Sequence, residues 1–588
     1  MSEQWLQDFN ALTQTSDPTA EQIEAVFEPG GFWRDFLTQT WNLHTAEGTQ
    51  EIAELLAHMD APIQHSVITD TAEEPGGVTR VHFDFTTPVF NAKAIARLRE
   101  GKCWTLLTSA RDLVDFPEPS GRNRPRGAIH GQAGDGENWA DRRAKRRATL
   151  GITEQPYVLI IGGGQGGIAL AARLKRQGVP TLVIDKAERP GDQWRGRYHS
   201  LCLHDPVWYD HLPYLPFPDH WPVFTPKDQM GDWLEHYVGI MDLDYWTQTE
   251  CLNARFTDGT WEVRVNRAGE ELTLRPTQLV FATGMSGVPN KPTLPGQDTF
   301  AGEIRHSSEH PGGSADAGKH VVILGANNSA HDIAADLYAN GAKPVMVQRS
   351  STHIVQSDTL MEEVFGPLYS EDAVEAGLDT DSADLLFASI PYKVLPEVQK
   401  EVFDRIRVRD KAFYDKLEQA GFLLDFGDDD SGLFMKYLRR GSGYYINVGA
   451  SELVADGSIP VYSNVSIQEV KERSVILTDG TEIPAETIIL ATGYGSMSGW
   501  VAQLINPETA ATLGLVWGLG SDTTKDPGPW EGELRNMWKP TQVQQLWLHG
   551  GNLHQSRHYS RYLALQLKAR YEGLDTPVHK LAEVHHQG

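Results

Sequence analysis

Two glycine-containing turns in this sequence have the spacing that binds the phosphates of a dinucleotide. The first, Gly162-x-Gly164-x-x-Gly167, directly follows the apolar run YVLII and directly precedes a helical pattern. The first glycine permits a tight turn, the second lets backbone approach a pyrophosphate, and the third lets the helix pack on the strand. Asp185 closes the next predicted strand, where an acid accepts hydrogen bonds from ribose hydroxyls. A dinucleotide with a free ribose, FAD or NAD, is therefore expected here.

Nine residues around this loop are the candidate contacts to the first dinucleotide. The segment GDQW, residues 191–194, follows Asp185 closely enough to run along the same ligand. Trp194 could cover that ligand, and packing in the protein core is the alternative for a buried tryptophan. The nine candidates are Gly162, Gly164, Gln165, Gly166, Gly167, Asp185, Lys186, Gln193 and Trp194.

The second turn, Gly325-x-Asn327-x-x-Ala330, repeats the arrangement in a weaker form. Asparagine tolerates left-handed backbone and alanine is still small, so a phosphate turn is expected. The following strand ends in Arg349 and Ser350 rather than in an acid. An arginine beside a hydroxyl suits a ribose 2′-phosphate, which favours NADPH over NADH; a solvated arginine at a strand end is the alternative. The candidates here are Gly325, Asn327, Asn328, Ser329, Arg349 and Ser350.

A histidine segment, FAGEIRHSSEHPGG at residues 300–313, lies between the two loops. His306 is a candidate catalytic residue because histidine can transfer protons near neutral pH. The alternative is that the segment joins the two dinucleotide domains, with Phe300 anchoring it and His306 hydrogen-bonding across the junction. Two different dinucleotide sites in one chain imply electron transfer between them.

The order of these motifs predicts an α/β fold with two Rossmann-like dinucleotide-binding domains. Strand, glycine turn, helix and strand follow one another from Tyr157 and again from His320. We expect the FAD-binding domain over residues 155–290 and 487–588, and the NADPH-binding domain over residues 291–486.

The other segments differ from these domains in pattern. Residues 1–117 alternate like strands and repeat like helices, so a small α+β domain is expected. Residues 118–154, rich in proline, glycine and arginine, predict a linker or strap that is either a solvated tether or a binder of an anion. A polar helical insertion at 357–440 should roof part of the site. Its aromatic residues are candidate lining or core residues: Phe365, Tyr369, Phe387, Tyr392 and Phe434.

Composition and charge narrow the classes of partner. Hydrophobic residues make up 40% of the chain and charged residues 22%, as in an ordinary globular protein. The formal net charge of −27 disfavours nucleic acid and anionic membranes. The sequence has no run of about 18 apolar residues and no leader pattern, so a cytoplasmic location is expected. The three cysteines lie far apart, which argues against a disulfide framework, a metal site and a dithiol centre.

Together these motifs resemble the flavin-containing monooxygenases, class B flavoproteins with FAD and NADPH domains. The matching pieces are GGGQGG (162–167), GDQW (191–194), FATG (281–284), FAGEIRHSS (300–308), GANNSA (325–330) and LATGY (490–494). Residues 198–218 look like the plant auxin-forming members. Residues 31–56 resemble the cone-shaped α+β fold of the nuclear transport factor family, an extension found in the bacterial type II branch.

The resemblance implies FAD and NADPH as cofactors, O2 as co-substrate and a small organic substrate. Reduced flavin would form a C4a-(hydro)peroxyflavin that inserts one oxygen atom, either in Baeyer–Villiger oxidation of a ketone or in oxygenation of sulfur or nitrogen. His204 stands where many members carry a catalytic asparagine, so it could bond to the peroxide or to NADP⁺; a packed core histidine is the alternative. Asp205, Thr492 and Gly493, within or beside the matching motifs, complete the candidate cofactor contacts.

Two departures from the family pattern leave questions open. The weakened second loop could relax nicotinamide selectivity and admit NADH. His310 stands where members have tyrosine or phenylalanine and Baeyer–Villiger enzymes have tryptophan, so the subclass is undecided. For residues 1–117 we expect a docking or dimerisation module without a ligand, which would allow a homodimer through or near it.

Other classes share parts of this pattern. Disulfide or ferredoxin reductases have both βαβ units, but the former needs paired cysteines, and neither explains residues 300–308. A reductase or NADPH oxidase that releases peroxide, or a flavoprotein scaffold without enzymatic activity, would fit the two loops alone. Rapid bleaching of the flavin by NADPH, then a long-lived intermediate that absorbs in the near ultraviolet on mixing with oxygen, would distinguish the monooxygenase from all of these.

Overall fold

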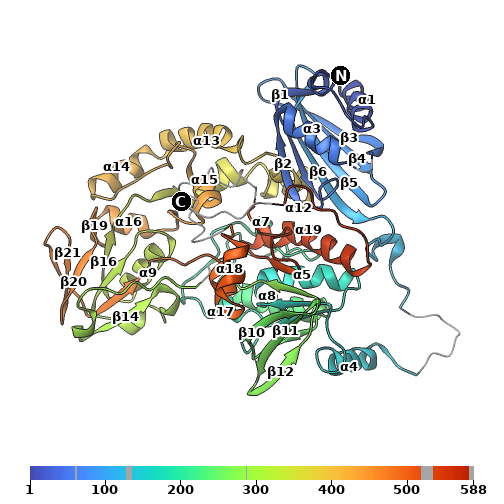
Figure 1. Cartoon of the computed structure of the whole chain (residues 1–588). Helices are drawn as coiled ribbons and strands as arrows, with labels where there is room; N and C mark the ends of the chain where they lie inside the picture. The colour runs from blue at the N-terminus through green and yellow to red at the C-terminus, as the bar shows by residue number, and fades with distance from the viewer. Residues whose placement is uncertain (60–61, 128–135, 286–287, 518–533, 582–588) are drawn as a thin grey trace.

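The computed structural model of the chain describes residues 1–59, 62–127, 136–285, 288–517 and 534–581. Its strands form an N-terminal mixed sheet and two five-stranded parallel sheets, together with smaller sheets (Figure 1). No helix in these described stretches is long and apolar enough to cross a bilayer.

The N-terminal sheet is packed against three helices. Its order is β2-β1-β6-β5-β4-β3, with β1 and β6 parallel and the other neighbours antiparallel. Trp5, Phe9, Phe27, Trp33 and Phe83 fill the space between helices and sheet, with contacting ring centroids 5.3 to 6.2 Å apart. Side chains therefore occupy the interior of this unit. The elements are α1 (Ser2–Thr13), α2 (Ala20–Val26), β1 (Phe27–Phe36), β2 (Leu43–Glu47), α3 (Gly48–His58), β3 (Gln64–Glu74), β4 (Val78–Thr86), β5 (Phe90–Arg99) and β6 (Lys102–Leu113).

The segment that follows the N-terminal sheet contains a helix, which the prediction of a linker or strap did not include. α4 (Trp139–Thr149) begins with a capping box in which Asn138 and Asp141 satisfy each other's backbone N–H groups. Its Arg143 donates to Asp242 at 2.6 Å and its Arg146 donates to Asp244 at 3.0 Å. These arginines bind carboxylates of the first dinucleotide unit, so the chain itself supplies their anions.

The first dinucleotide unit is a parallel sheet in the order β24-β13-β7-β8-β9. Its central strands are short, fully buried and rich in branched apolar residues, as parallel strands covered on both faces require. The antiparallel β10 (Thr249–Thr257), β11 (Thr260–Arg267) and β12 (Glu270–Leu274) lie beside it. The unit comprises β7 (Val158–Ile161), α5 (Gln165–Arg176), β8 (Thr181–Ile184), α6 (Asp192–Arg195), α7 (Val207–Asp210), α8 (Lys227–Ile240), β9 (Tyr245–Trp246), β13 (Gln278–Phe281), β24 (Leu546–Leu548) and α19 (Leu553–Tyr571).

The second dinucleotide unit has the order β14-β23-β15-β16-β19, again all parallel. The sequence predicts residues 487–588 in the first unit, and for β23 (Thr487–Leu490) this is wrong. β23 pairs with β14 and β15, because parallel pairing joins strands that are distant in the chain. The other elements are β14 (Glu303–His306), β15 (His320–Leu324), α9 (Asn328–Ala339), β16 (Lys343–Gln348), β19 (Val461–Ser463), and the small sheet β20 (Ile467–Val470), β21 (Ser474–Leu477) and β22 (Glu482–Pro484).

A helical region follows the second phosphate loop and lies between Ser357 and Arg440, the range predicted for an insertion. Two strands flank it and pair in parallel, β17 (His353–Gln356) and β18 (Tyr444–Asn447). The helices are α10 (Ser357–Leu360), the π-helical turn Met361–Phe365, α11 (Glu371–Glu375), α12 (Thr380–Ala388), α13 (Leu395–Arg409), α14 (Lys411–Gln419) and α15 (Gly432–Arg440). Further along the chain lie α16 (Ala450–Ala455), α17 (Ser498–Leu504) and α18 (Pro507–Leu513).

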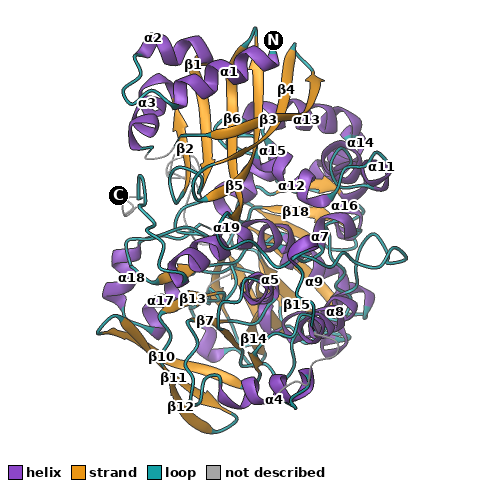
Figure 2. Ribbon diagram, turned by 90° about the vertical axis from the view of Figure 1, so that its right-hand side faces the viewer, coloured by secondary structure: helices purple, strands orange, loops and turns teal. Residues whose placement is uncertain are grey.

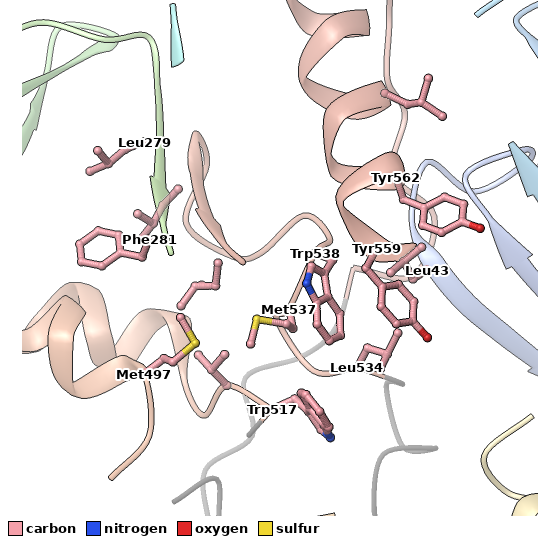
Figure 3. Packing of buried hydrophobic residues seen from close by; sticks show 14 of the residues in the cluster. Leu43, Leu279, Phe281, Met497, Trp517, Leu534, Met537, Trp538, Tyr559 and Tyr562 are labelled. Carbon is pink, nitrogen blue, oxygen red and sulfur yellow. The ribbon is translucent and has the colours of Figure 1, made fainter. Parts of the chain in front are cut away.

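One hydrophobic core connects the N-terminal sheet with the first dinucleotide unit. Figure 3 shows Leu43 of β2 near Tyr559 and Tyr562 of α19, and on the other side Phe281 of β13. Trp538 stacks on Tyr559 with ring centroids 4.4 Å apart. Figures 1 and 2 both place α19 between the two sheets. The N-terminal unit is thus packed on the first dinucleotide unit and is not a separate, loosely tethered module.

Candidate active site

The first phosphate loop has the backbone geometry that its glycines predict. Gly162 has φ +105°, and a Cβ there would lie 2.3 Å from the carbonyl oxygen of Ala282. A Cβ on Gly167 would lie 2.0 Å from the carbonyl oxygen of Gly162, so only glycine lets α5 approach β7 this closely. α5 begins without a side-chain cap, which leaves its first N–H groups for a ligand.

Asp185 is held at the end of β8 by three donors. The backbone N–H of Gly163 donates to it at 2.6 Å, that of Ala187 at 2.8 Å, and the side-chain amide of Gln193 at 2.7 Å. An ionised carboxylate has about four acceptor sites, so capacity remains for a ribose hydroxyl. This geometry fixes the acid beside the glycine loop, where a free ribose would need it.

A single cavity of about 1320 Å³ connects the two dinucleotide units. Its volume exceeds the ~300–1,000 Å³ of a usual ligand pocket, so more than one ligand fits. The cavity is lined by ten residues that the sequence singled out: Gly162, Gly164, Gln165, Gly166, Asp185, Lys186, Gln193, His204, Asp205 and Asn328. The first nine come from the first unit, and Asn328 opens α9 of the second.

The other predicted contacts do not line this cavity. They are Gly167, Trp194, Gly325, Asn327, Ser329, His306, Arg349, Ser350, Thr492 and Gly493. Gly167 serves close packing, as described above. Trp194 is half-buried and packs against the apolar cluster of the first unit, while its neighbour Gln193 lines the cavity.

The second loop also has the geometry of a phosphate turn. Gly325 has φ +136°, and a Cβ there would lie 2.5 Å from the carbonyl oxygen of Ala491. Asn327 precedes α9 without capping it, because its side-chain oxygen accepts from Thr352 Oγ1 at 3.2 Å instead. The first N–H groups of α9 are therefore available to an anion.

Arg349 and Ser350 follow β16, next to the strand that leads into the second loop. Both side chains are exposed. Within the described chain, Arg349 makes no hydrogen bond or ion pair. A free guanidinium at this strand end is placed for a ribose 2′-phosphate of a dinucleotide on the second loop.

His204 connects the first unit to the helix of the second. Its Nε2 lies 3.6 Å from a carboxylate oxygen of Asp332 in α9, and the hydroxyl of Tyr198 donates to the same carboxylate. Burial raises the pKa of Asp332, while the charge of His204 and the hydrogen bond from Tyr198 act in the opposite direction. His204 faces the cavity on one side and an acid on the other, so it is not simply a core histidine.

His306 is buried and both of its ring nitrogens are engaged. The N–H of Ser308 donates to Nδ1 at 3.2 Å, so Nε2 carries the proton and donates to the carbonyl oxygen of Gly493 at 3.0 Å. Burial lowers the pKa of His306, which keeps the ring neutral. Direct proton transfer by His306 is therefore not supported by this geometry, because the ring lies outside the cavity and has no free nitrogen.

Thr492 and Gly493 belong to the same junction. The hydroxyl of Thr492 donates to the carbonyl oxygen of Asn290 at 2.5 Å. The N–H of Asn290 donates to the carbonyl oxygen of Gly493 at 2.9 Å. With His306 they join β14 and the end of β23 to the segment leaving the first unit. Tyr494, the next residue, lines the cavity and contacts the ring of His306.

His310, the unusual residue of the histidine segment, lies in a polar network of the second unit. Its Nε2 is 3.3 Å from Asp336 and its Nδ1 is 3.4 Å from Arg305. Hydrogen bonding from His310 lowers the pKa of Asp336. Since His310 is buried and does not line the cavity, this position does not touch the reacting groups directly.

Aromatic side chains line part of the cavity, which is called the chamber below. The sequence predicted only some of these side chains. Phe365 and Phe434 line the chamber as candidates, whereas Tyr369, Phe387 and Tyr392 do not. Tyr369 instead donates to Asp384 at 2.9 Å. The chamber's further aromatic residues, which sequence reasoning missed, are Tyr209 of α7, Tyr437 of α15, Tyr444 of β18, Tyr494 and Trp500 of α17.

Orphaned polar atoms at the cavity wall fit a bound dinucleotide. Thr283 Oγ1, Gln193 Oε1 and Trp500 Nε1 are buried and have no hydrogen-bond partner in the described chain. Buried polar groups almost always have a hydrogen-bond partner, so a bound ligand would supply the partners of these atoms. Thr283 could have been found in advance, because it lies in the FATG motif; nothing local in the sequence marks Trp500.

The positions of the three cysteines show whether a paired-cysteine centre lies beside the cavity. Cys251 lines the cavity, and burial raises its pKa to about 12, so it is a protonated thiol. Cys103 is buried in the N-terminal unit, and all three cysteines are free. Two dinucleotide units that share one cavity define the architecture of a two-dinucleotide oxidoreductase, and the described residues include no paired cysteines beside that cavity.

Comparisons with known proteins extend this conclusion. A family model described as pyridine nucleotide-disulphide oxidoreductase matches residues 159–388. Indole-3-pyruvate monooxygenase YUCCA1 of Oryza sativa subsp. japonica is 31% identical over 344 residues, which cover 58% of this chain and 77% of the relative. Probable indole-3-pyruvate monooxygenase YUCCA9 of Arabidopsis thaliana is 30% identical over 352 residues, with 59% and 76% covered.

A solved structure shares the fold. The epsilon-caprolactone-bound structure of cyclohexanone monooxygenase superposes with a TM-score of 0.50 at 18% identity, covering 71% of this chain and 88% of that chain. The chain belongs to the flavin-containing monooxygenase family, and it is a flavin-dependent monooxygenase. Its cofactors are a flavin and a nicotinamide dinucleotide.

Proposed function

We propose that this chain uses NADPH and O2 to insert one oxygen atom into a small, largely apolar substrate S. The balanced reaction is NADPH + H⁺ + O2 + S → NADP⁺ + H2O + SO. Bound FAD would accept the hydride of NADPH and activate O2. The observation that carries the proposal is the cavity of about 1320 Å³, which brings together the first loop, the start of α9 and an aromatic chamber.

The residues of the two loops support the assignment of the cofactors. The N–H groups of α5, with Gly164 open to a ligand, would bind the pyrophosphate of FAD, and Asp185 its ribose. The N–H groups of α9 and the free Arg349 would bind NADPH. An exposed Arg349 is the reason to expect NADPH over NADH.

His204 favours oxygenation of nitrogen or sulfur over Baeyer–Villiger oxidation of ketones. His204 lines the cavity, and its Nε2 lies 3.6 Å from a carboxylate oxygen of Asp332, so an imidazole N–H can be held at the cavity wall. A proton donor at the cavity wall suits an electrophilic oxygen, which attacks amines and thioethers. Ketones need the deprotonated, nucleophilic form instead.

A substrate panel tests the proposal. FAD-loaded enzyme is mixed with thioethers, tertiary amines, cyclic ketones and one aromatic 2-oxo acid, since the relatives are named for indole-3-pyruvate. NADPH consumption, product and released peroxide are measured together. We expect S- or N-oxide in amounts that match the NADPH consumed. Peroxide equal to NADPH with every substrate would instead identify an NADPH oxidase.

We infer that neither nucleic acid nor an anionic membrane is a partner, because the formal net charge of the chain is −27. We also infer a small-molecule substrate and a cytoplasmic location. The N-terminal unit, with its interior filled by aromatic residues, supports a docking module better than a ligand-binding cone. A homodimer near this unit is tested by sedimentation of the full chain.

A further inference from the structure

Asp205 is a cavity-lining acid without a partner. It directly follows His204 in the loop before α7, and it makes no hydrogen bond or ion pair within the described chain. Other acids of this region are satisfied, since Asp185 accepts three hydrogen bonds and Asp192 pairs with Arg195 at 2.8 Å. A half-buried carboxyl that the protein leaves unpaired is available to a ligand.

Aromatic residues line the same cavity as this carboxyl. They include Tyr209, Tyr437 and Tyr444. For Tyr209 and Tyr444, burial and then the negative charge of Asp205 raise the pKa. The hydroxyls of two of these tyrosines are already engaged. Asn552 donates to Tyr209 at 3.3 Å, and Tyr437 donates to Gln555 at 2.6 Å. The faces of aromatic rings attract cations, so rings and acid favour the same sign of charge.

One basic side chain lies beside this acid: His204 precedes it in the chain, lines the cavity and acts on it electrostatically. The other basic residues of the lining are Lys186, which follows Asp185, and Arg197, whose side chain is exposed. Arg557 lies behind Tyr209, but it is bound to Asp384 at 2.7 and 2.9 Å. Asp210 is buried outside the cavity lining, and burial raises its pKa, which favours the neutral form. Asp205 is therefore the acid that this part of the wall presents to a ligand.

We propose that Asp205 is a specificity-determining residue, which binds an ammonium or N–H group of the substrate and disfavours organic anions such as 2-oxo acids. This inference rests on the proposed function of the same cavity. A charge-assisted hydrogen bond to a carboxylate favours a substrate that carries a protonated amine. A carboxylate in the chamber would instead be repelled by the like charge of Asp205.

Three thioethers that differ in one end group test the proposal. They are 3-(methylthio)propylamine, 3-(methylthio)propanol and 3-(methylthio)propionate, which share a reactive sulfur and carry positive, zero and negative charge. Calorimetric binding to the oxidised, FAD-loaded full chain and kcat/KM for sulfoxide formation are measured for each. The variant is Asp205→Asn, and the control is Asp219→Asn, which removes a fully exposed acid.

We expect the wild type to prefer the amine over the propionate. Asp205→Asn should weaken binding of the amine by roughly 10- to 100-fold, strengthen that of the propionate and leave the alcohol within about threefold. Asp219→Asn should keep the wild-type order. Equal binding of all three by the wild type, or an unchanged order in Asp205→Asn, would overturn the inference. If Asp205→Asn raised only the KM for NADPH, the inference would also be overturned, because Asp205 would then contact the nicotinamide cofactor and not the substrate.

The outcomes separate this inference from the proposed function. Sulfoxide formed from all three compounds without charge preference would leave the monooxygenase intact and refute the role of Asp205. Binding that prefers the amine without any sulfoxide would refute heteroatom oxygenation and support Asp205. If Asp205→Asn does not retain FAD, the wild-type binding order of the three ligands decides alone.

Discussion

At the scale of the residue, similar carboxyl groups of this protein have different tasks because their surroundings differ. Asp185 accepts three N–H groups beside a phosphate loop and keeps capacity for one more donor. Asp332 lies between the two units, 3.6 Å from His204, and accepts from the hydroxyl of Tyr198. Asp205 accepts no hydrogen bond within the described chain, and burial raises its pKa to about 6. A chemical role follows from what surrounds the acid and not from the residue type.

The raised pKa of Asp205 makes a prediction about stability. Because the folded-state pKa lies above the unfolded value near 4, the favourable contribution of the protonated acid is present below about pH 4 and is lost as pH rises through 6. Asp205→Asn should therefore raise the Tm at pH 8 and change it little at pH 4.5. Thermal unfolding followed by circular dichroism at both pH values checks this; equal shifts would contradict it.

Arg349 makes a prediction about nicotinamide selectivity. Its free guanidinium should bind only the 2′-phosphate, so Arg349→Ala should raise the KM for NADPH roughly 10- to 100-fold and leave that for NADH nearly unchanged. Steady-state kinetics with both dinucleotides measures the effect. Lys343→Ala, an exposed cation at the other end of β16, is the matched control. Parallel losses with both dinucleotides would show a structural role.

At the scale of the element, local patterns predicted what depends on neighbouring residues. The glycine spacing of both loops, the buried strands before them and the helices after them were all readable, because each depends on a few consecutive side chains. The capping box of α4 is also a local pattern, formed by Asn138 and Asp141. It was not predicted, because the surrounding proline, glycine and arginine residues indicated a strap. The position of β23 in the second sheet could not be predicted from local patterns. Parallel pairing joins it to β14, which lies more than 180 residues earlier.

The aromatic chamber shows a second limit of prediction. Phe365 and Phe434 line it, while Phe387 packs on Phe434 with centroids 5.6 Å apart. In a sequence, an aromatic residue that lines a cavity and one that fills a core have the same periodicity, because both turn away from solvent. Only the three-dimensional packing of α15 and β18 against α7 separates the two.

The approach of α5 to β7 makes a prediction at this scale. Alanine at Gly167 would place a Cβ 2.0 Å from the carbonyl oxygen of Gly162, so Gly167→Ala should displace the loop and abolish FAD retention. The ratio of flavin to protein absorbance after purification measures this. Gly239→Ala in α8, where a Cβ meets nothing within 4 Å, should retain full flavin. A yellow Gly167→Ala enzyme would contradict the close-packing argument.

At the scale of the whole molecule, the N-terminal unit is attached by buried polar contacts. Arg34 is fully buried and donates to the carbonyl oxygens of Ala388 at 2.5 Å and Ile390 at 3.2 Å. Arg97 donates to Ser389 at 2.8 Å. These contacts fix the C-terminal end of α12, whose Asp384 binds Arg557 of α19. The unit thus supports the helices that stand behind the chamber.

Removing one of these contacts makes a prediction about unfolding. Arg34→Ala would leave two buried carbonyl oxygens without a donor, which should lower the free energy of unfolding by roughly 3 kcal/mol. Arg99→Ala, whose side chain is 42% exposed on β5, should cost less than about 1 kcal/mol. Urea unfolding followed by tryptophan fluorescence compares the variants. A small effect at Arg34 would indicate a loosely held N-terminal unit.

The hydrogen bond between Ser109 and Tyr562 joins residues 453 positions apart, and it has a consequence for biosynthesis. The N-terminal unit presents an apolar face, including Phe36 and Leu107, that α19 covers only after the residues between them have been translated. At a translation rate of about 5–20 residues per second, the apolar face stays exposed for roughly 20 to 90 s. The nascent chain should therefore depend on chaperones that shield hydrophobic surface, although the finished protein buries it within one continuous core.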